Sequence, residues 1–77
     1  MDPNATWKRL LEEIAGQSWE DAAATADDLL GWLQRGGFPP DVFSERPLAE
    51  SWNRALARFT CELVLTEAGD RLGQMCE

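Results

Sequence analysis

The side chains that could do chemistry are few in this sequence, and they lack the partners that catalysis needs. There is no histidine, so the usual general base and the commonest metal ligand are both missing. No imidazole is therefore available to activate the hydroxyls of Ser18, Ser44 and Ser51 or the thiols of Cys61 and Cys76. Two thiols also cannot complete a four-ligand zinc site within one chain. We predict no catalytic residue, no metal site and no bound cofactor.

The acidic residues offer a different kind of chemistry, which is charge recognition. Fourteen acids against seven bases give a net charge of −7, which repels the phosphates of nucleic acids and of anionic membranes. Four acids precede the next basic residue, Arg35, along one expected helix: Glu20, Asp21, Asp27 and Asp28. They form either a solvated face or a strip that docks on a basic protein surface as a mimic of phosphate charge. Direct nucleic-acid binding is not expected.

The length and composition predict one domain spanning residues 1–77. No apolar run approaches the ~18 residues of a membrane span, and the first residues lack the plan of a signal peptide. We therefore expect a cytoplasmic protein without a membrane contact, whose two cysteines are reduced. A core of this size seldom supplies more than about 3–5 kcal/mol, so association with a second copy is a reasonable expectation.

The first segment predicts a helix over residues 3–15. Asp2 is suited to the N-cap, and Pro3 to the first helical position, because proline lacks the amide hydrogen that would go unbonded there. Four apolar residues then share one helical face: Trp7, Leu10, Leu11 and Ile14.

The second segment predicts a helix over residues 18–35, joined to the first by a short antiparallel turn. Ser18 is expected as its N-cap, with Asp21 in a position resembling a capping box. Gly36 and Gly37 should end the helix by supplying a position with a positive φ, and the prolines after them prevent its continuation. The predicted core stripe consists of Trp19, Ala22, Ala26, Leu29 and Leu33.

The third segment predicts a longer helix over residues 46–68 that crosses this hairpin, with Pro47 in its first turn and with Val42 and Phe43 dipping into the core before it. The residues expected to pack on the hairpin are Leu48, Trp52, Ala55, Leu56, Phe59, Leu63 and Thr66. A second apolar set follows the spacing of a coiled-coil seam and predicts a symmetric dimer: Cys61, Leu65, Ala68, Leu72 and Met75. Residues 69–77 either continue the helix through Gly69, as this seam requires, or fray while the same apolar residues complete the monomer's core.

At ~100° per residue, Trp32 lies about 140° from the core stripe of its helix. The helical pattern therefore does not decide whether Trp32 is buried or exposed. This residue either packs within the fold, under the returning Phe38-Pro39-Pro40 segment or against the third helix, or serves, with Phe38, as an aromatic anchor for a partner. The candidate partner surface therefore comprises Trp32, Phe38, Glu20, Asp21, Asp27 and Asp28.

Two stretches resemble known sequences. Residues 15–30, from Ala15-Gly16 through Ser18-Trp19 to Leu29-Leu30, resemble the turn and second helix of a tetratricopeptide repeat, which implies a helical hairpin. Residues 28–40, reading DLLGWLQRGGFPP, resemble a stretch of small uncharacterised bacterial and phage proteins. The second resemblance implies a free-standing small protein and assigns no activity.

Together these observations predict an all-α, three-helix domain consisting of an antiparallel helical hairpin and a longer crossing third helix. The expected function is a small acidic protein-protein interaction or adaptor module, homodimeric and without catalysis. The alternative is an acidic inhibitor, of the kind a phage could encode, that blocks a basic site on a host or phage protein. The identity of the partner is not predictable from these residues.

Overall fold

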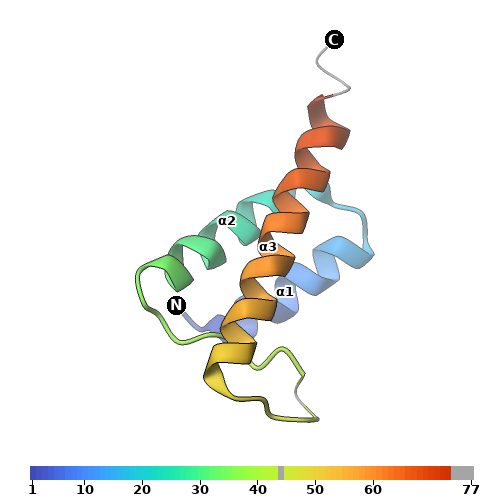
Figure 1. Cartoon of the computed structure of the whole chain (residues 1–77). Helices are drawn as coiled ribbons and strands as arrows, with labels where there is room; N and C mark the ends of the chain where they lie inside the picture. The colour runs from blue at the N-terminus through green and yellow to red at the C-terminus, as the bar shows by residue number, and fades with distance from the viewer. Residues whose placement is uncertain (44, 74–77) are drawn as a thin grey trace.

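A computed structural model describes residues 1–43 and 45–73, with side chains described as far as Arg71. It contains three helices, α1 (Pro3–Ala15), α2 (Trp19–Gln34) and α3 (Glu50–Gly73). As Figure 1 shows, α1 and α2 form an antiparallel hairpin, and the longer α3 crosses in front of it. The predicted all-α architecture is confirmed. α2 is the central element, because it packs against both α1 and, more extensively, α3.

The start of α1 follows the sequence prediction, whereas the start of α2 does not. The Asp2 carboxylate accepts hydrogen bonds from the amides of Asn4 at 3.1 Å and Ala5 at 3.3 Å, so it caps α1. Ser18 occupies the N-cap position of α2, but its side chain makes no capping hydrogen bond. The turn between the helices places Gln17, and not Gly16, in the left-handed region, with a φ of 58°.

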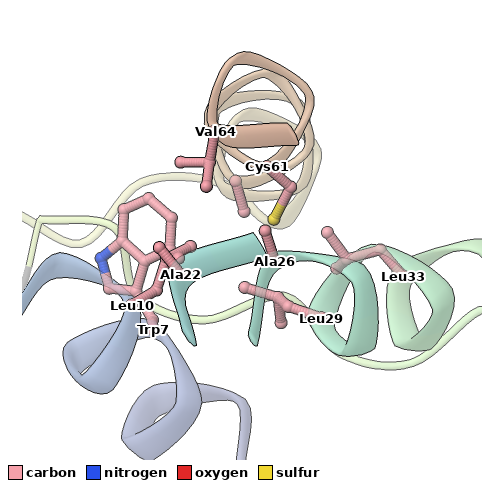
Figure 2. Close-up of a cluster of buried hydrophobic side chains, with 9 residues drawn as sticks. Trp7, Leu10, Ala22, Ala26, Leu29, Leu33, Cys61 and Val64 are labelled. Atoms are coloured by element: carbon pink, nitrogen blue, oxygen red, sulfur yellow. The ribbon is translucent and has the colours of Figure 1, made fainter. Parts of the chain in front are cut away.

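The core lies where α3 presses on the hairpin. Figure 2 shows Cys61 and Val64 descending from α3 onto Ala22 and Ala26 of α2, with the side chains of α1 at one end of the cluster. The predicted core stripe of α2 is confirmed, apart from Trp19, which is only half-buried. The buried cluster consists of Trp7, Leu10, Ala22, Ala26, Leu29, Leu33, Ala57, Cys61 and Val64.

The prediction for the buried face of α3 is wrong. Trp52, Phe59 and Leu63 were expected to pack on the hairpin, but they are 64%, 60% and 53% exposed. The residues that do pack there are small, above all Ala57 and Cys61, both fully buried. The surface that α2 offers explains the choice: its alanines leave it flat, so a facing helix approaches closely only with small side chains. Large aromatic side chains at this contact would hold the two helices apart.

The bounds of α3 also differ from the prediction. The helix begins at Glu50, not at residue 46, and Pro47 precedes it. Ala49 acts as the cap residue, since its carbonyl accepts from the amides of Trp52 at 3.0 Å and Asn53 at 3.1 Å. At the other end α3 passes through Gly69 and ends at Gly73, so the first part of the segment 69–77 is helical.

The end of α2 is a turn made by two glycines. The amide of Gly36 donates to the carbonyl of Leu33 at 3.1 Å, and that of Gly37 to the carbonyl of Trp32 at 2.9 Å. This pair of bonds is the Schellman arrangement, which needs a positive φ at the first residue after the helix C-cap. Gly36 supplies it, with a φ of 84°, as the sequence predicted.

The long connection from α2 to α3 is fixed by polar side chains more than by apolar ones. The guanidinium of Arg54, on α3, donates to the carbonyls of Leu33 at 2.9 Å and Gly37 at 2.8 Å. Asn53, which is 4% exposed, accepts from the amide of Val42 at 3.3 Å and donates to the carbonyl of Leu48 at 3.2 Å. Side chains of α3 thereby satisfy four backbone groups at the end of α2 and in the connection.

Apolar contacts in this connection are limited to a few residues. Pro40 is fully buried, and Val42 is half-buried against the core, as predicted. Phe43 was expected to dip into the core, but it is 55% exposed. Among the described residues of the connection, Pro40 and Val42 therefore reach the interior, whereas Phe43 lies on the surface.

Candidate protein-binding surface

Four large apolar residues form a continuous line along the side of α3 that faces away from the hairpin. We refer to this line as the outer stripe: Trp52, Leu56, Phe59 and Leu63. Their spacing of four, three and four residues keeps them on one helical face and is the spacing of a coiled-coil seam. Three of them are more than half exposed, and Leu56 is half-buried. In Figure 1, α3 lies in front of the hairpin, with no other helix on its outer side.

The outer stripe lies opposite the packed face of the same helix. At ~100° per residue, Cys61 is about 160–200° around the helix from the members of the stripe next to it. α3 therefore carries two apolar faces, a small-residue face that packs on α2 and a large-residue face that does not pack on the chain. Contiguous exposed apolar surface of this kind is rare on monomeric proteins and commonly marks an interaction site.

Charged pairs border the outer stripe. Arg58 and Glu62 form an ion pair at 3.1 Å on one flank, and Glu67 and Arg71 form another at 2.7 Å near its C-terminal end. Both pairs are exposed and join residues four apart on the helix, so each adds only a few tenths of a kcal/mol to stability. Their main effect is to surround an apolar line with a polar rim, which is the composition of many protein interfaces.

A shallow groove runs beside the C-terminal half of the outer stripe. It lies where the end of α1 and the start of α2 meet α3, and its lining is largely apolar: Ile14, Trp19, Thr60, Leu63, Val64 and Glu67. The guanidinium carbon of Arg71 lies 5.0 Å from the centre of the Trp19 ring, within the range of a cation–π contact. This contact holds the far end of α3 against the hairpin and fixes one wall of the groove.

The residues predicted as a dimer seam are in a different position. Cys61 and Ala68 are buried by the chain itself, at 0% and 2% exposure, and Leu65 is half-buried against the core. Two members of this seam cannot be placed, because Met75 and the side chain of Leu72 lie outside the described part of the chain. For Cys61 and Ala68 the expectation of a free face is wrong, because these small side chains are what allows α3 to approach α2.

The environment of Cys61 also determines its reactivity. Burial, together with the negative charge of the neighbouring Glu62, raises the pKa of this thiol from 9.0 to about 11. The thiolate is the nucleophilic form of cysteine, so a thiol with this pKa is inert near neutral pH. Cys61 is a packing residue.

Trp32 is a structural residue rather than an open anchor. Its indole nitrogen donates to the carbonyl of Phe38 at 2.8 Å, and its ring packs beneath Gly37. This is the first of the two environments that the sequence left open for Trp32. Phe38 itself is 72% exposed, so the proposed pair of aromatic anchors is divided between a packed ring and an exposed one.

The four acids predicted as a strip all lie exposed on α2: Glu20, Asp21, Asp27 and Asp28. They are not members of the ion pairs found in residues 1–43 and 45–73. Asp27 and Asp28 border a small hollow together with Arg35 and Gln34. The strip is therefore present as an unpaired acidic surface, on a different element from the outer stripe.

No group of three or more potential metal ligands converges among the described residues. None of the helices in that part of the chain combines the length and apolar character that a membrane span requires. In comparisons with known proteins, no family model, no curated protein and no solved structure matches this chain.

Proposed function

We propose that this chain is a small acidic protein-protein interaction module without catalysis, and that it binds its partner through the outer stripe of α3. The observation that carries the proposal is the exposure of Trp52, Phe59 and Leu63 along one helical face. Burying surface of this kind on a partner is favourable by about 25 cal/mol per Å². A chain of 77 residues has little core of its own, so leaving three large side chains in water is costly for it.

The residue types support a binding role. Tryptophan is among the residues most enriched at the energetic centres of interfaces, where a few side chains supply most of the affinity. The stripe sits on a long helix whose opposite face is held by the core, so little ordering is needed when a partner binds. The ion pairs of Arg58 with Glu62 and of Arg71 with Glu67 lie beside the outer stripe. A partner therefore meets an apolar centre with a polar rim.

The proposal is tested by comparing the proteins that the immobilised chain retains from its native extract with those retained by a Trp52→Ser/Phe59→Ser variant. Both substitutions are at exposed positions, so circular dichroism should show an unchanged fold. A partner of the outer stripe is retained by the native chain and lost from the variant. A Phe38→Ser chain is the matched control, because it removes an equally exposed ring away from α3. Retention that is the same for the native chain and the Trp52→Ser/Phe59→Ser variant contradicts the proposal.

A second function uses the acidic surface of α2 to block a basic site on another protein. The observation in its favour is that Asp21 and Asp28 are exposed and lie outside the described ion pairs. Unpaired carboxylates of one sign steer a basic partner and compete with phosphate for it. In the same retention experiment, an Asp21→Lys/Asp28→Lys chain should lose such a partner while keeping one that binds the outer stripe. The two functions are therefore separated by which pair of substitutions matters.

A further inference from the structure

We infer that the outer stripe binds a second copy of this chain, with the two α3 helices antiparallel. The inference builds on the proposed function, because it names the partner of the same surface. It places the contact on the face opposite the seam that Cys61 and Ala68 would have formed. Three features of α3 specify this arrangement: the spacing of the stripe, the placement of acids along its line, and the groove at its C-terminal half.

The spacing makes the stripe complementary to itself when the helices run in opposite directions. A two-fold axis midway between residues 57 and 58 places Trp52 against Leu63 of the second copy, and Leu56 against Phe59 of the second copy. Each layer then pairs one aromatic with one leucine, so all four layers have similar volume. A closed two-fold contact uses the same patch on both copies, which suits a stripe that ends at the fourth layer.

The charges decide between the two directions. In a parallel pair, Asp70, which continues the line of the stripe and is exposed, would face its own copy, and Glu62 would lie beside Glu67 of the second copy. Like charges at such positions are destabilising. In the antiparallel pair, Asp70 lies beyond the start of the second copy's α3 and stays in water. Glu62 then lies beside Ala55 of the second copy, so the acids no longer meet.

The groove provides a place for the tryptophan. In the antiparallel register, Trp52 of one copy lies over Leu63 of the other, on the side where the groove opens. The apolar part of that groove is formed by Ile14, Trp19, Leu63 and Val64. A ring that is 64% exposed in one copy therefore meets an apolar hollow in the other, twice in each dimer. Aromatic rings seated in such hollows are typical energetic centres of interfaces.

The size of the contact indicates how tight the dimer is. With ~150–250 Å² for an aromatic side chain, two outer stripes and their grooves bury on the order of 1,000 Å² in total. This is at the lower end of the range for specific interfaces, where association is reversible. The dimer should therefore dissociate on dilution.

Sedimentation of the purified chain over a series of concentrations tests the inference. The native chain should shift from monomer to dimer as its concentration rises. Trp52→Ser should raise the dissociation constant at least ~30-fold, because the residue acts twice in each dimer. Phe38→Ser, the matched exposed aromatic, should leave it unchanged. A native chain that remains monomeric at every concentration, or a dimer that Phe38→Ser dissociates and Trp52→Ser does not, overturns the inference.

Cross-linking tests the direction of the helices. In a Cys76→Ser background, where Cys61 is buried and unreactive, chains carrying Ala55→Cys are mixed with chains carrying Glu62→Cys and treated with a short bis-maleimide. The antiparallel register predicts a mixed product that joins residue 55 to residue 62. Products that join residue 55 to residue 55 and residue 62 to residue 62 instead show a parallel pair and overturn the arrangement.

The inference and the proposed function fail separately. A chain that is monomeric but loses a retained protein upon Trp52→Ser/Phe59→Ser binds a different partner with the outer stripe, so only the second copy is rejected. If these substitutions change neither the dimer nor the set of retained proteins, the outer stripe is not a binding surface, and both the inference and the proposed function are contradicted.

Discussion

Gly37 lies directly against the indole ring of Trp32, so close that a Cβ atom on residue 37 would overlap the ring. The amide of Gly37 also donates to the carbonyl of Trp32, and the indole nitrogen donates to the carbonyl of Phe38. The backbone of Trp32 therefore helps to end α2, and its side chain binds the first residues of the connection that follows. A glycine at this position is required by contact with the ring, whereas Gly36 is required by its positive φ.

Gly37→Ala should destabilise the fold by about 1–3 kcal/mol, because the ring and the turn must move apart to admit the methyl group. Gly69→Ala is the matched control: it lies within α3 with nothing near its Cβ position, so it should stabilise the fold by about 0.5–1 kcal/mol. Urea unfolding followed by circular dichroism measures both. Equal effects of the two substitutions would contradict the close contact at Gly37.

Arg54→Met should lower the free energy of unfolding by about 1–3 kcal/mol, since one charged side chain satisfies the carbonyls of both Leu33 and Gly37. The side chain is 32% exposed, so water compensates part of the loss. Arg58→Met, one turn along α3, removes only an exposed ion pair and should cost at most about 0.5 kcal/mol. If the two variants melt at the same temperature, Arg54 does not hold the end of α2.

Asn53→Ala should cost about 1–3 kcal/mol, because it leaves the amide of Val42 and the carbonyl of Leu48 without their partner at a site that is nearly closed to water. Asn4→Ala removes a single exposed bond to the amide of Asp41 and should cost less than half as much. Thermal unfolding of the two variants checks the order. A smaller loss of stability for Asn53→Ala than for Asn4→Ala would show that the buried side chain of Asn53 does not hold the connection in place.

Cys61 should make stability depend on pH in the alkaline range. Its pKa is about 11 in the folded chain against an ordinary value of 9.0, so the folded state keeps a proton that the unfolded state releases. The stabilisation is complete below about pH 9 and falls as the pH rises towards 11. Urea midpoints of the native chain and of Cys61→Ala, measured across this interval, should converge as the pH rises. A constant difference between them would contradict the shift.

The hairpin was predictable because most of the apolar residues of each of its helices lie on one face. Leu10 and Leu29 lie on stripes of uniform period, and both are fully buried. The caps were less predictable, because a sequence gives residue types and not the direction of a hydroxyl. Asp2 caps α1, whereas Ser18, equally suited by type, does not cap α2.

The third helix could not be oriented in the same way. It has two apolar faces with helical spacing, and the sequence prediction placed Phe59 and its neighbours on the hairpin and Cys61 on a dimer seam. The structure reverses this assignment, because the alanines of α2 select for small residues opposite them. The informative signal was present in the sequence, as Ala57 and Cys61 match Ala22 and Ala26 in size. It becomes decisive only when it is known that α3 packs against this part of α2.

The polar fixing of the segment between α2 and α3 has a consequence for deuterium exchange. The amides of Asp41 and Val42 belong to no helix, yet each donates to a side-chain amide oxygen, that of Asn4 and of Asn53 respectively. Their hydrogens should therefore exchange with solvent more slowly than those of ordinary surface loops. Asn4 belongs to α1 and Asn53 to α3. The exchange rates of the amides of Asp41 and Val42 therefore report how long α1 and α3 both remain in contact with the connection between α2 and α3.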